Sequence, residues 1–231
     1  MIRQFPLDLR WPPHQRLDAF WPGANVPALQ GVSDAAKGAG AWLYLHGASG
    51  TGKSHLLIGA CRAALEAKRP ARYVSLAQLA TPRSDAMTGI QPEGLLAIDD
   101  VHAIAGDREA ERALFDLYNR ATTAGARMLF AANASPAELG ITLPDLVSRL
   151  SMCTQYALRP LDDAGRRAML RGLAGRLGLR LDDEVLDWWF ARQPRDPASL
   201  VALLQRVDRA SLAAQRRVTI PFLRELLGKP A

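Results

Sequence analysis

The chain has 231 residues, of which 48% are apolar and 23% are charged, and its formal net charge is +6. This length suits one large domain or a larger and a smaller one, and the basic balance favours acidic partners such as nucleotides and nucleic acid. No stretch approaches the ~18 consecutive apolar residues of a membrane span and no signal-peptide pattern is present, so we expect a cytoplasmic protein without a membrane partner. The two cysteines belong to no C-x-x-C pattern and the four histidines show no metal-ligand spacing, so the sequence suggests no metal site made of protein side chains alone.

Strands and helices are expected to alternate after an irregular, proline-rich tail at 1–22. Apolar runs bounded by turn residues predict five strands, at 41–47, 71–79, 94–100, 127–133 and 154–158. Apolar residues at helical spacing predict helices at 53–68, 108–125 and 143–150. Such alternation predicts an α/β fold with a five-stranded parallel sheet covered on both faces.

The pattern changes at Pro160. From there on, the sequence contains three or four helical stretches and no convincing buried strand. We therefore expect the tail over 1–22, an α/β domain over 23–159 and a small all-α domain over 160–231.

The stretch GASGTGKS at 47–54 satisfies the phosphate-binding pattern G-x-x-x-x-G-K-[ST] at every fixed position. Phosphates carry crowded negative charge, so the loop has to approach closely with bare N–H groups, which glycine permits. An expected strand precedes the loop and an expected helix follows it, so the helix N-terminus faces the phosphates. Lys53 is placed to reach the β and γ phosphates, and the Ser54 hydroxyl is placed to bind Mg²⁺. The candidate nucleotide-binding residues are Gly47, Gly50, Thr51, Gly52, Lys53, Ser54 and His55.

The apolar run LLAIDD ends in the acidic pair Asp99 and Asp100. A carboxylate at the end of a buried strand suits a Mg²⁺ site, so we expect Asp99 and Ser54 to form it; the alternative is that Asp99 only caps a turn. Asp100 is placed to orient an attacking water, although its side chain is one methylene shorter than the glutamate often found there. Asn133 ends the fourth expected strand, where it either contacts a water or the γ-phosphate or simply opens the turn NASP.

Arg149 lies in LPDLVSRL, where the leucines and the valine share the apolar face of the expected helix. This spacing turns Arg149 away from the core. Two roles remain open for it: a solvated surface arginine, or an arginine finger that reaches the nucleotide of a neighbouring subunit. Arg149, Asp100 and Asn133 are the candidate catalytic residues.

Together these motifs resemble those of the DnaA-related AAA+ proteins, and among them the Hda-like proteins. The resemblance covers nearly the whole chain. Beyond the general ATPase motifs, it depends on FWPG at 20–23, AGD at 105–107, FDLYNR at 115–120 and the series DRAS, AQR and TIPF within 208–222. It implies an AAA+ P-loop NTPase domain followed by a helical lid, in agreement with the change at Pro160.

The resemblance also implies a role for the N-terminal tail. Hda-like proteins carry a clamp-binding peptide of the form Gln-x-x-Leu-x-Leu, and QFPLDL at 4–9 matches it. Phe5, Leu7 and Leu9 would fill a cleft of the DNA polymerase III sliding clamp while the Gln4 amide fixes the register, each buried side chain contributing ~1.5–3 kcal/mol before ordering costs. The alternative is a tail that folds onto its own domain.

By the same resemblance, the protein is a negative regulator of replication initiation. It would hold ADP or ATP with Mg²⁺, ADP being the expected resident nucleotide, and would contact DNA only through the clamp. It would offer Arg149 to the ATP of an adjacent DnaA, where an arginine supplied in trans is worth about 10³–10⁵ in rate. Association with further copies of the chain is left open.

The sequence departs from the family at the lid. Related proteins place a nucleotide-contacting arginine there, whereas Ala198 occupies the position here and Arg195 lies one turn earlier. The complete P-loop also leaves intrinsic ATP turnover open. Two other functions therefore remain alternatives: a stand-alone ATPase of the helicase-loader type, and a non-catalytic adaptor that tethers another factor to the clamp.

Overall fold

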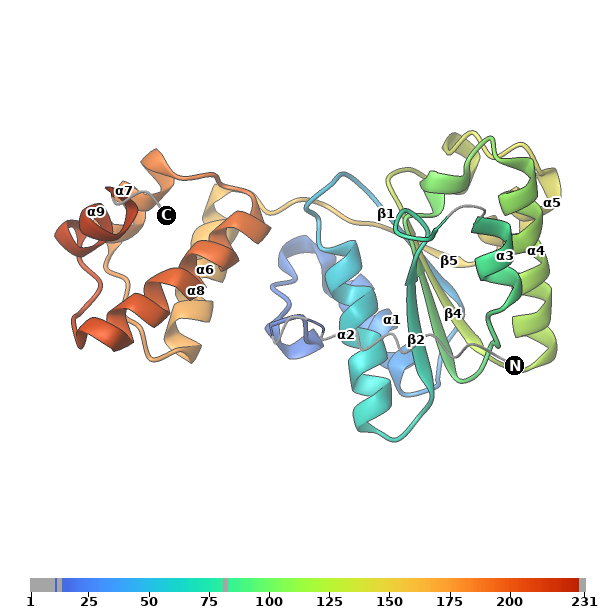
Figure 1. Ribbon diagram of the computed structural model, residues 1–231, viewed down its shortest axis with the longest axis horizontal. Coiled ribbons are helices and arrows are strands. Elements are labelled where there is room, and N and C mark those ends of the chain that lie inside the picture. Colours follow the sequence, from blue (N-terminus) through green and yellow to red (C-terminus); the bar gives the residue numbers. More distant parts are fainter. Residues whose placement is uncertain (1–10, 12–13, 81–82, 229–231) are drawn as a thin grey trace. The chain divides into compact units, whose positions relative to one another are not determined.

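The computed structural model describes residues 11, 14–80 and 83–228. The chain forms two compact units, which divide between Arg159 and Pro160. Figure 1 shows the first unit as a sheet between helices and the second as a group of helices. None of the helices in the described ranges combines the length and the apolar character that a bilayer span needs.

The sheet has five parallel strands in the order β2-β3-β4-β1-β5. The strands are β1 (Leu43–His46), β2 (Ala71–Ser75), β3 (Leu95–Asp99), β4 (Arg127–Ala132) and β5 (Thr154–Ala157). Each lies within a range expected from the apolar runs, so the predicted five-stranded parallel sheet is confirmed. Because the strands are parallel, the loop after β1 and the carboxyl ends of β3 and β4 lie at the same edge of the sheet, where α/β proteins bind ligands.

Two layers of helices cover the sheet because neighbouring side chains on a strand point to opposite faces. Leu95 and Ala97 of β3 belong to the core that α1 and α2 share, and Leu96 and Ile98 belong to the core that α3, α4 and α5 share. With both faces covered, every residue of β3 is buried. The helices are α1 (Val26–Ala36), α2 (Lys53–Glu66), α3 (Arg83–Thr88), α4 (Arg108–Thr123) and α5 (Pro144–Ser151).

The chain segment before α1 packs onto α2, where the sequence predicts an irregular tail. Arg16 forms an ion pair with Glu66 at 2.7 Å. Leu17 approaches α2 so closely that a Cβ on Gly59 would lie 2.9 Å from Leu17 Cδ2. Short 3-10 turns at Leu17–Ala19 and Gly23–Asn25 carry the chain into α1. The sequence pattern predicts no element where α1 and α3 occur.

The second unit consists of helices packed around Trp189, which is fully buried. Asp162 and Asp196 cap two of these helices by accepting hydrogen bonds from the backbone N–H groups of Gly165 (2.7 Å) and Ser199 (2.9 Å). The all-α part of the predicted fold is therefore confirmed. The helices are α6 (Asp163–Arg176), α7 (Asp183–Arg192), α8 (Pro197–Ala214) and α9 (Ile220–Gly228).

Candidate functional site

The phosphate-binding loop connects β1 to α2 and has a backbone that only glycine adopts readily. Its φ angles are 145° at Gly47, 78° at Gly50 and 94° at Gly52. A Cβ on Gly47 would lie 2.5 Å from the carbonyl oxygen of Leu158, and a Cβ on Gly52 would lie 2.6 Å from Cε2 of Phe20. Both ends of the loop therefore require glycine. A loop that binds phosphate through exposed backbone N–H groups has the same requirement.

Lys53 begins α2 and folds back over this loop. Its Nζ donates hydrogen bonds to the carbonyl oxygens of Gly47 (2.6 Å) and Ala48 (2.8 Å). Thr51 is buried and donates its hydroxyl to the same Ala48 oxygen at 2.9 Å, which closes the loop. Burial lowers the pKa of Lys53, while the acidic pair at the end of β3 acts in the opposite direction. The ammonium group is thus held at the cradle by two carbonyl oxygens of the loop.

Asp99 is almost fully buried at the end of β3 and accepts two hydrogen bonds. The Tyr73 hydroxyl donates to its Oδ2 at 2.8 Å, and the backbone N–H of Asp100 donates to its Oδ1 at 2.8 Å. Burial raises the pKa of Tyr73, and the Ser54 side chain acts in the opposite direction, so the phenol lies near both predicted Mg²⁺ ligands. Asp100 has a left-handed backbone (φ 57°) and accepts a hydrogen bond from the Ser75 hydroxyl at 2.6 Å.

Tyr73 is a further residue of the candidate site that the sequence pattern does not indicate. It lies in the middle of β2, where an aromatic side chain is ordinary. It reaches Asp99 because β2 pairs with β3 in a register that sets Ser75 beside Asp99. β2 is the neighbour of β3 because of the strand order of the sheet, and the sequence pattern does not determine that order.

The donor set of this site fits a nucleoside phosphate with a hard cation. N–H groups and Lys53 suit the phosphates, and the oxygen atoms of Ser54 and Asp99 suit Mg²⁺, which binds through one or two protein oxygens together with phosphate oxygens. The described residues include no cluster of three His, Cys, Asp or Glu side chains that would hold a metal by itself. A cation bound here would therefore depend on the phosphates.

Asn133 follows β4 directly and is exposed. Phe130 of β4 pairs with Ile98 of β3, and Ala132 pairs with His46 of β1. The sheet thus brings Asn133 to the edge that the loop after β1 and Asp99 also occupy. Its contact with a water or a phosphate stays a prediction.

Arg149 lies on α5 and is exposed, whereas Leu146 and Leu150 of the same helix are fully buried. Its guanidinium carbon lies 5.8 Å from the centre of the Tyr118 ring, and it forms no ion pair with any residue that the structure describes. Helix α5 lies on the opposite face of the sheet from α2 (Figure 1). Arg149 is therefore separate from the phosphate-binding loop of its own chain.

Two family models match the chain. The model of the bacterial DnaA ATPase domain covers residues 16–157, and the model of the Hda lid domain covers residues 163–227. The chain belongs to the bacterial DnaA ATPase family. Its lid is of the Hda kind, so the predicted DnaA-related AAA+ relationship is confirmed.

Solved structures of this family share the fold. Domain III of the Thermotoga maritima replication initiation protein DnaA is 22% identical, with a TM-score of 0.74 over 95% of this chain and 99% of that one. A replication initiator DnaA bound to AMPPCP and single-stranded DNA is 22% identical, with a TM-score of 0.70 over 84% of this chain. The chain spans 64% of the length of that DnaA. A Thermotoga maritima RuvB is more distant, with 16% identity and a TM-score of 0.64 over 93% of this chain and 71% of that one.

The N-terminal segment of the DnaA-like domain borders the phosphate-binding loop. His55 Nε2 lies 2.8 Å from the carbonyl oxygen of Arg16, and the rings of His55 and Phe20 meet edge to face at 5.5 Å. Burial lowers the pKa of His55. Phe20 also contacts Gly52 of the phosphate-binding loop. The N-terminal segment therefore packs against both this loop and His55, a predicted nucleotide-binding residue. The clamp-binding residues predicted at Gln4, Phe5, Leu7 and Leu9 lie outside the described residues.

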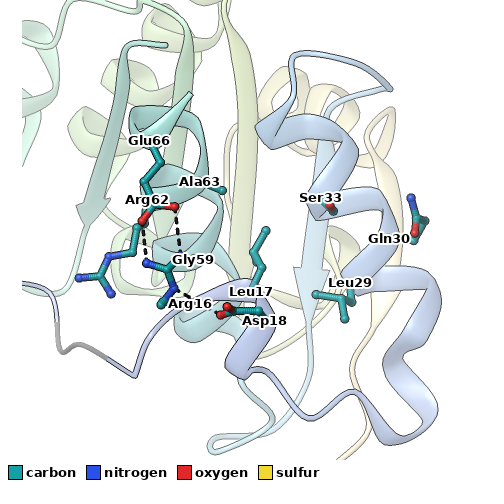
Figure 2. Close-up of a pocket in the computed structure, with 10 residues that line it drawn as sticks. All are labelled: Arg16, Leu17, Asp18, Leu29, Gln30, Ser33, Gly59, Arg62, Ala63 and Glu66. Carbon is teal, nitrogen blue, oxygen red and sulfur yellow. Dashed lines mark hydrogen bonds and ion pairs between the residues drawn. The ribbon is translucent and has the colours of Figure 1, made fainter. Parts of the chain in front are cut away.

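A hollow of about 450 Å³ lies beside this segment, between α1 and α2 (Figure 2). The ion pair of Arg16 and Glu66 crosses its rim, and Leu17 and Leu29 contribute apolar walls. None of the loop glycines, Asp99, Asn133 or Arg149 lines it. The hollow is therefore separate from the phosphate site.

The lid holds Arg195 in internal contacts. Its guanidinium forms an ion pair with Asp163 at 2.9 Å and donates to the carbonyl oxygen of Phe190 at 3.0 Å. Ala198 is exposed near the start of α8 and has no side chain for a polar contact.

Proposed function

We propose that this chain regulates replication initiation by acting on a DnaA molecule, to whose bound ATP it supplies Arg149. The observation that carries the proposal is the separation of two features on one domain. A complete phosphate cradle lies at one edge of the sheet, and an exposed arginine without a carboxylate partner among the described residues lies on the layer of helices that does not contain α2. An arginine placed in this way serves a neighbouring molecule better than its own nucleotide.

The chain's own nucleotide would hold the domain in its working form. Lys53 and the loop N–H groups would bind its phosphates, and Ser54 and Asp99 would bind Mg²⁺. Two solved relatives are described as bound to AMPPCP, which supports a nucleotide in this loop. We propose ADP as the resident nucleotide, because a regulator that persists in one form has no need of turnover.

In the reaction on DnaA, Arg149 would neutralise the charge that develops on the transferring phosphoryl group, an effect worth about 10³–10⁵ in rate. Asp100 and Asn133 belong to the chain's own site, where they would orient a water. The predicted tail residues Gln4, Phe5, Leu7 and Leu9 would tether the chain to the sliding clamp, and so bring it to DNA without a DNA contact of its own. Tethering raises the local concentration of Arg149 around DnaA.

A reconstituted assay tests this proposal. ATP-loaded DnaA is mixed with clamp-loaded DNA and with the wild-type chain, Arg149→Ala, Arg72→Ala or a chain that lacks residues 1–10. Arg72 is the matched control, because it is an exposed arginine on the edge strand β2. We expect Arg149→Ala to abolish the stimulated hydrolysis, Arg72→Ala to retain it, and the truncated chain to need a much higher concentration.

The outcomes separate the proposal from its alternatives. Stimulation by Arg149→Ala at the wild-type rate, together with loss on truncation, would favour a clamp adaptor. Rapid ATP turnover by the chain alone, increased by single-stranded DNA, would favour an ATPase of the helicase-loader type. In each variant, affinity for a fluorescent ADP analogue reports whether the phosphate site is intact.

A further inference from the structure

Two residues of α4 that lie seven positions apart contact α5 or the loop that leads into it: Glu111 bonds Leu143, and Tyr118 contacts Arg149. Residues at i and i+7 lie on the same face of a helix, two turns from one another. Glu111 is fully buried and Tyr118 is 8% exposed. One helix face thus presents a carboxylate near the start of α5 and an aromatic ring to Arg149 near the end of α5.

The Glu111 carboxylate joins two loops to α4. It accepts hydrogen bonds from the backbone N–H groups of Gly106 (2.8 Å), Thr142 (3.0 Å) and Leu143 (2.9 Å), and from the Thr142 hydroxyl (2.7 Å). Within the described residues, no basic side chain pairs with it. Leu143 immediately precedes α5, where a negative charge is favoured by the helix dipole. Glu111 therefore fixes the point at which α5 begins.

Tyr118 supports the other end of α5. Arg149 lies over its ring, which is itself held between Trp42, edge to face at 4.5 Å, and Phe130, stacked at 6.2 Å. A ring packed in this way cannot swing with the arginine. The cation–π contact instead limits the directions that the guanidinium takes on an otherwise exposed side chain.

We propose that Glu111 and Tyr118 are positioning residues for Arg149, the first by fixing the start of α5 and the second by supporting the guanidinium. The inference rests on the proposed function, since it assumes that Arg149 acts on a neighbouring nucleotide. Neither residue touches that nucleotide. A misplacement of about 1 Å at a reacting group costs up to about 100-fold in rate, so the two side chains affect rate rather than binding.

The test measures hydrolysis of DnaA-bound ATP on clamp-loaded DNA against the concentration of this chain. We expect Tyr118→Leu to lower the maximal rate by about 10- to 100-fold while the half-saturating concentration stays within about twofold. Tyr118→Phe keeps the ring and should retain wild-type activity, because the aromatic face provides the contact. Glu111→Gln keeps the shape of the side chain but turns an NH₂ group toward one of the donors, so we expect a drop of about tenfold in the maximal rate.

The kinetic constants distinguish positioning from a merely structural role. A misplaced Arg149 lowers the maximal rate alone, whereas a poorly folded chain would also bind DnaA and ADP more weakly, and Tyr118→Phe should restore the rate that Tyr118→Leu loses. ADP affinity should match the wild type in every variant. If Tyr118→Leu does not fold, the same measurements are made on Glu111→Gln.

Each result has a clear meaning. Wild-type maximal rates for both Tyr118→Leu and Glu111→Gln, with Arg149→Ala inactive, would overturn this inference and leave the proposed function in place. A loss of maximal rate in Tyr118→Leu that comes with an equal loss of ADP affinity would also overturn it. Full activity of Arg149→Ala would overturn the proposed function and the inference together.

Discussion

Replacement of Gly52 by alanine tests how the phosphate-binding loop is built. Gly52 has φ 94° and ψ 15° and directly precedes α2. A residue with a Cβ in a left-handed conformation costs roughly 1–2 kcal/mol. The new methyl group would also lie 2.6 Å from the Phe20 ring, and overpacking of this kind costs about 1–3 kcal/mol. We therefore expect Gly52→Ala to lower the free energy of unfolding by about 2–5 kcal/mol.

Gly140 provides the matched control. Its φ is 75°, and no atom lies within 4 Å of the position that its Cβ would take. Gly140→Ala therefore has only the backbone cost of about 1–2 kcal/mol. Gly140 lies outside the phosphate-binding loop, so its variant should bind nucleotide as the wild type does.

Urea unfolding without nucleotide measures the two free energies, and titration with a fluorescent ADP analogue measures affinity. Gly52→Ala should lose more stability than Gly140→Ala and should bind the analogue at least about tenfold more weakly, since both the cradle and Phe20 must move. Equal losses of stability, or wild-type affinity in Gly52→Ala, would refute this account of the loop.

Three further predictions concern buried polar groups and thiols. Tyr73→Phe removes a hydrogen-bond donor to the Asp99 carboxylate and should lower the free energy of unfolding, measured in EDTA, by about 1.5–3 kcal/mol. The control Tyr44→Phe removes a hydrogen bond to the neutral Ala134 carbonyl and should lower it by about 0.5–1.5 kcal/mol. Equal losses in the two variants would contradict the role given to Tyr73. Burial opposes the charge of Glu111, but the hydrogen bonds from Thr142, Gly106 and Leu143 outweigh it and lower its pKa. The stabilisation by the ionised Glu111 is therefore complete above the unfolded pKa of about 4.3 and disappears as the pH falls through the lower folded value. The stability difference between wild type and Glu111→Gln, measured from urea midpoints, should stay constant from pH 7 to pH 5 and shrink toward pH 3. An increase in this difference toward pH 3 would count against the prediction. Burial raises the pKa of Cys61 and of Cys153 to about 12, so iodoacetamide at pH 8 should label neither thiol until urea unfolds the chain, and rapid labelling of the native protein would show that these sites open.

The strands and the phosphate-binding loop could be predicted because each has a local signal. An apolar run such as LLAID, bounded by turn residues, is typical of a strand in a sheet covered on both faces, and it forms β3 (Leu95–Asp99). The glycines of the loop are explained by φ angles that other residues avoid. The change to helices after Pro160 was likewise visible as the loss of buried strand patterns.

Other parts depend on contacts that no local pattern reveals. The segment around Leu17 is irregular by sequence, yet it packs against Gly59, more than 40 residues away in the chain. Glu111 looks like a solvent-facing residue of an amphipathic helix, and only the loop at Thr142 makes it a buried acceptor. Tyr73 gains its role from the pairing of β2 with β3. Such residues are defined by partners distant in the chain, which periodicity does not identify.

The most direct test of the account follows a single phosphate. DnaA is loaded with ATP labelled at the γ-phosphate, this chain is preloaded with unlabelled ADP, and the two are mixed once on clamp-loaded DNA. Rapid release of labelled phosphate with the wild-type chain and with Arg72→Ala, and none above the DnaA background with Arg149→Ala, is the result that the account predicts. Release at the wild-type rate with Arg149→Ala, while its ADP remains bound, would contradict the claim that this arginine acts on a neighbour's nucleotide.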